Sequence, residues 1–168
     1  MKGACIFIIE DSKIILETIK HILELELEAR VLPFDSAEAA LEKLDIYNPD
    51  IILLDYYLDS QDKNNMNGLD FIKRLSLRKK MPFIIMISGQ RDKLITTKVL
   101  QTGAVNYLSK EDEGFLDNLV IEIQSNLKTK KIHQKQAKQY RELRVRRVRV
   151  AAFIVVPVLI ALIINHCQ

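Results

Sequence analysis

Carboxylates follow two apolar runs of this chain, at the point where each run ends. Glu10 and Asp11 come directly after the run of residues 6–9, and Asp55 follows the run of residues 51–54. Such runs are typical of buried strands, and open α/β sheets bind ligands at the carboxyl edge of their strands. Three carboxylates gathered there need a cation to stay ionised, and Mg²⁺ prefers oxygen ligands of this kind. The sequence therefore predicts an acidic metal-binding pocket.

A hydroxyl and an amine follow two further apolar runs. Ser88 comes directly after residues 83–87, and Lys110 comes shortly after residues 106–108. A carboxylate can act as a covalent nucleophile, while a metal ion and a lysine neutralise charge on a phosphoryl group. Taken alone, Asp55 would be better explained as a strand-end carboxylate that caps the next loop. The combination of a carboxylate, a metal site, a hydroxyl and a lysine predicts a phosphoryl-accepting site.

These residues require a sheet that brings the ends of several strands together. Segments of helical periodicity lie between the apolar runs, one of them N-capped by Ser36 and another, at residues 94–100, ended by Gly103. Five consecutive βα units predict one parallel sheet with helices on both faces. The expected strands are residues 4–9, 29–33, 50–54, 82–87 and 105–108.

The chain resembles the receiver domain of two-component response regulators over about residues 3–127. The resemblance implies an α/β, flavodoxin-like fold, with a five-stranded parallel sheet in the order 2-1-3-4-5 and helices on both faces. Receivers are often followed by an output domain, but the residues after 127 are too few for a winged helix or a catalytic domain. We therefore expect a single-domain response regulator whose output is protein–protein contact with a downstream target, and nucleic acid is not expected as a partner. The residues that carry the resemblance are Glu10-Asp11, Asp55, Ser88-Gly89, Gly103-Ala104 and Tyr107-Leu108-Ser109-Lys110.

The resemblance also implies a role for each site residue. Asp55 would accept a phosphoryl group from a histidine kinase or a histidine phosphotransfer protein. Lys110 would pair with that group, Ser88 would hydrogen-bond it, and Tyr107 would change rotamer as the domain switches. Such a domain promotes only its own phosphorylation and dephosphorylation, so no other enzyme activity is expected. Mg²⁺ would be held by Glu10, Asp11, Asp55 and the backbone carbonyl of Tyr57.

The chain departs from the receiver pattern at two places. The turn at residues 66–68 comes late, so the loop of residues 56–67 carries an insert. Its acids, Asp59 and Asp62, are expected to be solvated rather than to bind metal. Lys110 is followed by an acid instead of proline, and a cis bond there would cost about 2.5–4 kcal/mol without proline. We therefore expect the local turn to differ.

The net charge of +3 hides a division of the chain into three parts. Residues 1–127 hold 15 Lys and Arg against 21 Asp and Glu, a charge of −6. Residues 128–149 hold 10 Lys and Arg against the single acid Glu142, a charge of +9, and residues 150–168 hold none of these. We expect a receiver domain, then a basic helical linker, then an apolar C-terminal segment.

The apolar segment is a candidate membrane anchor. Residues 150–164 form an uncharged run of 15, which as a helix spans about 22 Å and falls short of a hydrocarbon core of about 30 Å. Pro157 is costly in a soluble helix and tolerated in a membrane helix. This interpretation predicts a cytoplasmic protein tethered to the cytoplasmic face of the membrane, with the basic linker attracted to anionic lipids.

Alternatives remain for both the tail and the domain. The apolar segment could dock in a homodimer or on another protein, and the basic linker could bind nucleic acid, which would leave the apolar end unexplained. The domain could be a phosphorelay intermediate that passes its phosphoryl group onward. It could also be a membrane docking or adaptor module that is never phosphorylated, in which case an Asp55→Asn variant would keep its phenotype.

Overall fold

The computed structural model describes residues 3–58, 66–78, 81–89 and 106–166, with side chains to residue 145. The expected helical segment at residues 94–100 lies outside this part of the chain. The strands are β1 (Ala4–Ile9), β2 (Ala29–Phe34), β3 (Ile51–Asp55), β4 (Phe83–Ser88) and β5 (Asn106–Ser109), and the helices are α1 (Lys13–Glu26), α2 (Ala37–Tyr47), α3 (Gly68–Ser76) and α5 (Phe115–His166).

The five strands form one parallel sheet in the order β2-β1-β3-β4-β5. This is the predicted sheet order, and each strand begins and ends within one residue of its predicted position. The central strands are buried along nearly their whole length, because a parallel sheet is covered on both faces.

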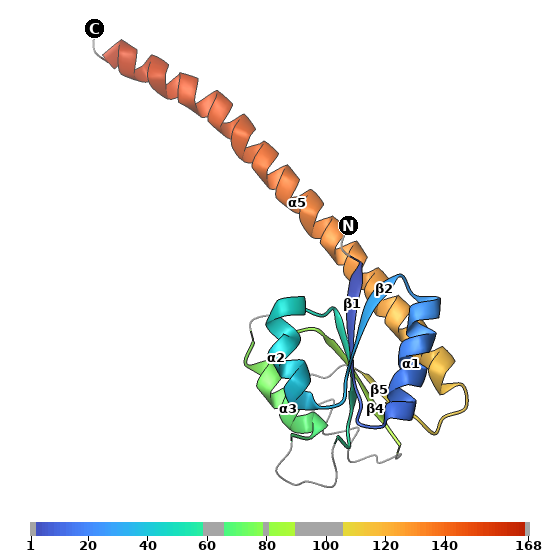
Figure 1. The fold of residues 1–168 in the computed structure, drawn as a ribbon. Coiled ribbons are helices and arrows are strands. Elements are labelled where there is room, and N and C mark those ends of the chain that lie inside the picture. Colours follow the sequence, from blue (N-terminus) through green and yellow to red (C-terminus); the bar gives the residue numbers. More distant parts are fainter. Residues whose placement is uncertain (1–2, 59–65, 79–80, 90–105, 167–168) are drawn as a thin grey trace. The chain divides into compact units, whose positions relative to one another are not determined.

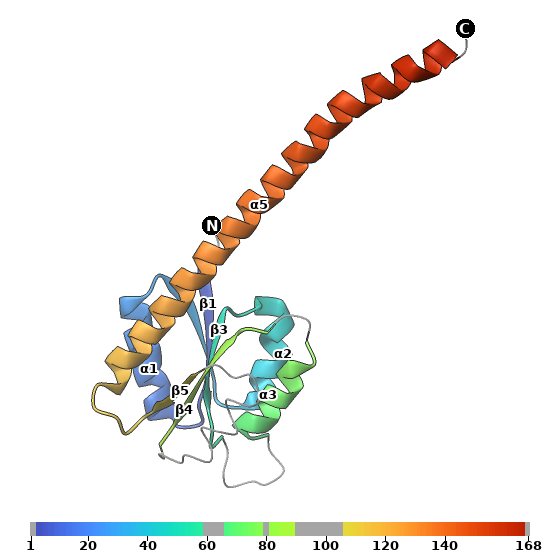
Figure 2. The same ribbon diagram turned by 180° about the vertical axis from the view of Figure 1, so that it is seen from behind.

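Helices cover both faces of the sheet, as predicted. In Figures 1 and 2, α1 and the first turns of α5 lie on one face, and α2 and α3 lie on the other. Side chains of a strand alternate between faces, so Phe7 and Ile9 pack in the α2–α3 core while Ile6 and Ile8 pack in the α1–α5 core. The two cores fix the sheet between its helices and so fix the positions of the strand ends.

Two helix starts differ in their capping. Ser36 is the N-cap residue of α2, as predicted, but its hydroxyl makes no hydrogen bond to the helix backbone and instead donates to Asp35 at 3.3 Å. Asn67 caps α3 through its side chain, since its side-chain oxygen accepts the backbone N–H of Asp70 at 3.0 Å. The second cap fixes the start of α3.

The chain divides into two compact units, residues 1–127 and residues 128–168. The second unit is helical from its first residue to His166. His133 is exposed, as expected from its polar surroundings. Among the residues whose side chains the structure describes, which end at residue 145, no helix is both long enough and apolar enough to cross a membrane.

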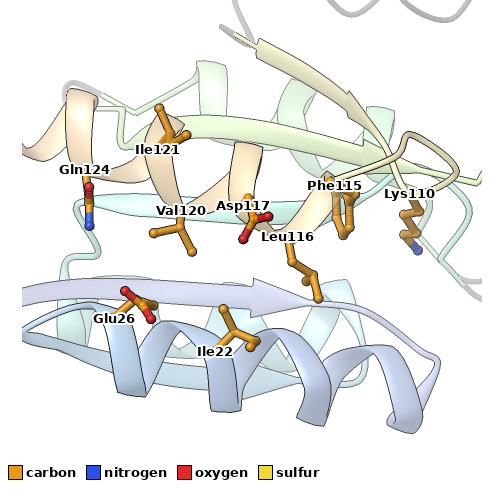
Figure 3. Close-up of a pocket in the computed structure, with 10 residues that line it drawn as sticks. Ile22, Glu26, Lys110, Phe115, Leu116, Asp117, Val120, Ile121 and Gln124 are labelled. Carbon is orange, nitrogen blue, oxygen red and sulfur yellow. The ribbon is translucent and has the colours of Figure 1, made fainter.

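A pocket of about 740 Å³ lies between α1 and the first turns of α5. Figure 3 shows Ile22 and Glu26 on α1 facing Val120 and Asp117 on α5. The pocket belongs to the first unit alone, and its floor is continuous with the core on that face of the sheet.

Candidate functional site

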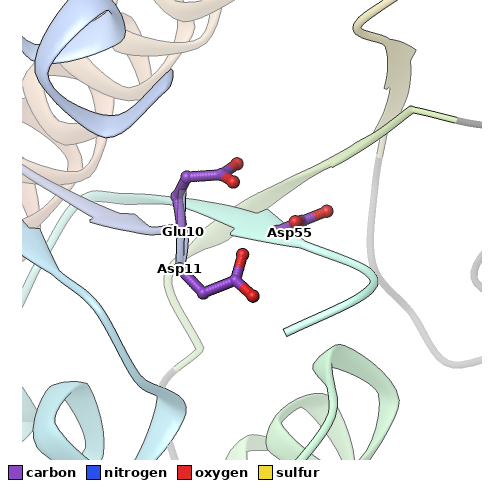
Figure 4. A group of neighbouring side chains, drawn as sticks. All are labelled: Glu10, Asp11 and Asp55. Atoms are coloured by element: carbon purple, nitrogen blue, oxygen red, sulfur yellow. The ribbon is translucent and has the colours of Figure 1, made fainter. Parts of the chain in front are cut away.

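The strand ends bring three carboxylates together at one edge of the sheet. Because β1 and β3 are neighbours, Glu10, which follows β1, lies beside Asp55, the last residue of β3. One carboxylate oxygen from each of Glu10, Asp11 and Asp55 lies within 4.8 Å of the other two. Figure 4 shows the three side chains gathered at this edge.

The cluster fits a hard divalent cation. Glu10 and Asp55 are only 1% and 4% exposed, so water does little to relieve the repulsion between their charges. Asp11 is exposed, which leaves the cluster open to solvent on one side. Mg²⁺ takes carboxylate oxygens and keeps several of its waters, so it suits a cluster with one open side.

The pKa of Glu10 shows how unfavourable the charges are. Burial raises the pKa of Glu10 above its ordinary value, and the charge of Asp55 raises it further. The Lys110 ammonium and the backbone N–H of Ser12, which Glu10 Oε1 accepts at 3.3 Å, act in the opposite direction without cancelling the rise. The acidic edge therefore favours a bound cation or a bound proton.

Lys110 places its ammonium between two of the carboxylates. Its Nζ lies 2.5 Å from Oε2 of Glu10 and 3.0 Å from Oδ2 of Asp55. The lysine directly follows β5, and its backbone N–H donates to the carbonyl of Ser88 at 2.8 Å. The ladder between β4 and β5 thus continues to Lys110 and directs this side chain over the carboxyl edge.

Backbone groups orient the carboxylate of Asp55. Its Oδ1 accepts the backbone N–H of Tyr57 at 3.3 Å, while its Oδ2 faces Lys110. The backbone N–H of Tyr56 donates to the carbonyl of Ile87 at 3.0 Å, which extends the β3–β4 pairing past the end of β3. Tyr57 therefore contacts Asp55 through its amide, and the metal-binding role of its carbonyl stays a prediction.

The remaining predicted residues lie on β4 and β5. Ser88 is fully buried at the end of β4 and lies in register with Ser109. Tyr107 is half-buried on β5 and packs against the core that faces α2 and α3. Their roles toward a phosphoryl group stay predictions. Asp59 and Asp62 lie outside the described residues.

The turn after Lys110 has no cis peptide bond, and neither has any other described part of the chain. The backbone N–H of Asp112 donates to the carbonyl of Ser109 at 3.2 Å, and that of Glu111 donates to the Ser109 hydroxyl at 3.3 Å. Ser109 thus closes a compact turn around Lys110 without proline.

Two contacts that sequence reasoning missed position Met66 and Gly68 at the start of α3. A Cβ at Gly68 would lie 2.6 Å from the backbone oxygen of Asp55, so only glycine fits there. Glu38 of α2 accepts the backbone N–H of Met66 at 2.9 Å. The glycine at the start of α3 could have indicated from the sequence that another part of the backbone lies close to it. Nothing local in the sequence marks Glu38, because its partner is distant in the chain.

The family of this chain follows from comparison with known proteins. A model of the response regulator receiver domain matches residues 6–120, more than half of the chain. The chain belongs to the response regulator receiver family. In this receiver, the carboxylates that the geometry brings together are those of Glu10, Asp11 and Asp55.

Curated relatives share the receiver domain and extend beyond it. The chain is 35% identical over 107 residues to the transcriptional regulatory protein DegU of Brevibacillus brevis, covering 63% of this chain and 43% of that protein. It is 32% identical over 108 residues to a protein-glutamate methylesterase/protein-glutamine glutaminase 2 of Paramagnetospirillum magneticum, covering 62% of this chain and 29% of that protein. The chain thus spans less than half the length of either relative.

Solved receiver structures have the same fold. A response regulator receiver domain from Methanospirillum hungatei superposes with a TM-score of 0.66 at 26% identity, covering 79% of this chain and 99% of that one. A receiver domain from Clostridium thermocellum gives a TM-score of 0.66 at 24% identity, covering 77% and 98% of the two chains. The latter similarity concerns the fold alone.

Proposed function

We propose that this receiver accepts a phosphoryl group on Asp55, with Mg²⁺ bound at the acidic edge, and signals through contact with a downstream protein. The observation that carries the proposal is the environment of the Asp55 carboxylate. It is buried, oriented by the Tyr57 amide, 3.0 Å from the Lys110 ammonium and within reach of Glu10 and Asp11.

In the proposed reaction, an oxygen of Asp55 attacks the phosphorus of a phosphohistidine on a histidine kinase or histidine phosphotransfer protein. The new O–P bond forms as the P–N bond breaks, and the histidine nitrogen keeps the electron pair of that bond. Mg²⁺, held by Glu10, Asp11 and Asp55, would neutralise charge on the phosphoryl oxygens.

The chain's own groups contribute positioning and charge. Lys110 is close enough to Asp55 to pair with a phosphoryl oxygen bonded to that carboxylate. Ser88, at the end of the intervening strand, is the proposed hydrogen-bond donor. Phosphorylation converts the Asp55 carboxylate to an acyl phosphate, which adds more acceptor oxygens than charge. Lys110 and Ser88 would therefore respond to the new phosphoryl oxygens.

The test is incubation of the full chain with acetyl phosphate, with and without Mg²⁺, followed by intact mass measurement. We expect an Mg²⁺-dependent gain of one phosphoryl group that is lost in Asp55→Asn. Asp50→Asn is the matched control, because Asp50 directly precedes β3, at the end of the strand opposite Asp55. The Asp50 side chain accepts the Cys5 backbone N–H at 2.8 Å, and the side-chain oxygen of asparagine can accept the same hydrogen bond. The proposal would be overturned if the Asp55→Asn variant still gained a phosphoryl group. It would also be overturned if folded wild-type protein gained none.

We further propose that residues 150–164 tether the receiver to the cytoplasmic face of the membrane. The support is the uncharged apolar run, which directly follows the basic linker of residues 128–149 with its ten Lys and Arg. A tethered receiver is confined to a surface, which raises the effective concentration of any partner confined there.

A further inference from the structure

The pocket between α1 and α5 leaves apolar side chains open to solvent. Ile121 is 63% exposed beside the pocket, although it lies on the wall next to core residue Val120. Ile22 on α1 faces Val120 across the pocket, as Figure 3 shows, and is only partly buried. From Leu116 to Gln124 the α5 wall runs about 12 Å along the helix axis, enough for about two turns of a docked helix.

The rims of this pocket are acidic. Glu26 stands on the α1 side and Asp117 on the α5 side, both exposed. Residues 110–127 hold five acids against Lys110 alone. The ammonium of that lysine is held by Glu10 and Asp55, so it does little to offset the rims. A helix that fills the pocket should therefore be apolar on one side and basic at its flanks.

The basic linker of residues 128–149 has this character. Ile132, Tyr140 and Leu143 are 47%, 74% and 55% exposed, and at 3.6 residues per turn they lie within an arc of about 80°. They extend about 16 Å along the axis, so the stripe is long enough to cover the pocket wall of about 12 Å and reaches slightly beyond it. The same helical geometry puts Lys135 and Arg144 on opposite flanks of this apolar stripe.

We propose that the basic linker of one copy docks in the α1–α5 pocket of a second copy, so that two chains form a reciprocal dimer. Each chain carries both halves of the contact, so one two-fold axis satisfies both pockets and closes the assembly. The −6 charge of residues 1–127 meets the +9 charge of residues 128–149 of the other chain. A dimer made by linker against linker would instead bring two +9 segments together.

The first test is the mass of the full chain in a non-ionic detergent, by size-exclusion chromatography with light scattering at low and high salt. We expect a dimer at 50 mM salt and a shift to monomer at 1 M salt, because the rim contacts are exposed and screened. A monomer at low salt, or a dimer indifferent to salt, would contradict the proposal.

A matched pair of variants locates the contact. Ile121→Asp puts a charge in the pocket and is expected to weaken the dimer by about tenfold or more, a change of about 1.4 kcal/mol. Ile46→Asp is the control, because Ile46 lies on α2, away from the pocket. Its side chain is 66% exposed, close to the 63% of Ile121, so both substitutions place a charge at a similarly exposed isoleucine. Equal dimer fractions in the two variants would place the interface elsewhere, for instance in residues 150–164.

Disulfide cross-linking separates docking between copies from docking within one chain. In a Cys167→Ser background, a chain with Ile121→Cys is mixed with a chain of different mass that carries Tyr140→Cys. A disulfide joining one copy of each chain is the expected product. If a chain carrying both substitutions forms its disulfide only as a monomer, the proposal fails.

Discussion

Lys110 and Asp55 meet across the carboxyl edge of the sheet, with the lysine Nζ 3.0 Å from Oδ2 of the aspartate, although β4 separates their strands. The same ammonium lies 2.5 Å from Glu10 on the far side of Asp55. One cation therefore partly neutralises two buried carboxylates that come from neighbouring strands. A phosphoryl group or a metal ion that binds at this edge must therefore change the existing ion pairs of Lys110 with Glu10 and Asp55.

Lys110→Met should destabilise the metal-free receiver, because it leaves two buried carboxylates without their cation. We expect a loss of the order of 3 kcal/mol in the free energy of unfolding, measured by urea denaturation, and a smaller loss with saturating Mg²⁺. Lys20→Met is the control, since Lys20 pairs with exposed Glu17 at 3.4 Å and should cost under about 0.5 kcal/mol. Equal losses in the two variants would show that the Lys110 bridge is not stabilising.

Glu10→Gln should have opposite effects on the metal-free and the metal-bound protein. The pKa of Glu10 is raised in the folded protein, so folding favours the neutral carboxyl. Protonation of Glu10 therefore stabilises the folded state at low pH, and this stabilisation is lost as pH rises through the folded-state pKa. Glutamine stays neutral, so the Tm without Mg²⁺ should rise at pH 7 and depend less on pH.

The same substitution removes a predicted metal ligand. The increase in Tm that Mg²⁺ produces in the wild type, a direct consequence of binding to the folded state, should shrink or vanish in Glu10→Gln. A variant that keeps the full Mg²⁺-induced increase would remove Glu10 from the ligand set.

Gly68→Ala should strain the start of α3 against the acceptor strand. The added methyl would lie 2.6 Å from the Asp55 carbonyl oxygen, so the backbone must shift, at a cost of about 1–3 kcal/mol. Phosphorylation by acetyl phosphate should slow as Asp55 moves. Gly89→Ala is the control for stability, because a Cβ there meets nothing within 4 Å and should change stability by less than about 0.5 kcal/mol.

Deletion of residues 150–164 should move the protein from the membrane pellet to the supernatant of cell lysates, because this run supplies the apolar area of the proposed tether. Full-length Asp55→Asn should stay in the pellet, since tethering does not depend on phosphorylation. An unchanged distribution after the deletion would reject the tether.

Strand positions were predictable to within one residue, and the small differences have local causes. We predicted a strand at residues 50–54, whereas β3 is Ile51–Asp55. Asp50 instead uses its side chain to accept the Cys5 backbone N–H at the start of β1. Likewise β4 begins at Phe83 rather than at Pro82, because proline has no N–H to give to the ladder.

The N-cap of α2 shows where local pattern was insufficient. Ser36 occupies the predicted position, yet its hydroxyl is bonded to Asp35 and not to the helix. A serine before an apolar helix marks where a helix begins, because its backbone conformation suits that position. Which acceptor its hydroxyl chooses depends on neighbouring side chains, and the helical pattern does not encode them.

The sequence by itself determined the sheet, its order through the family resemblance, and the gathering of Glu10, Asp11 and Asp55. It did so because apolar runs define strands and parallel strands share their carboxyl edge. Only the tertiary structure decided that Lys110 bridges Glu10 as well as Asp55, that Glu38 holds Met66, and that α1 and α5 leave a pocket between them. Those features depend on distances between elements far apart in the chain, which no local period specifies.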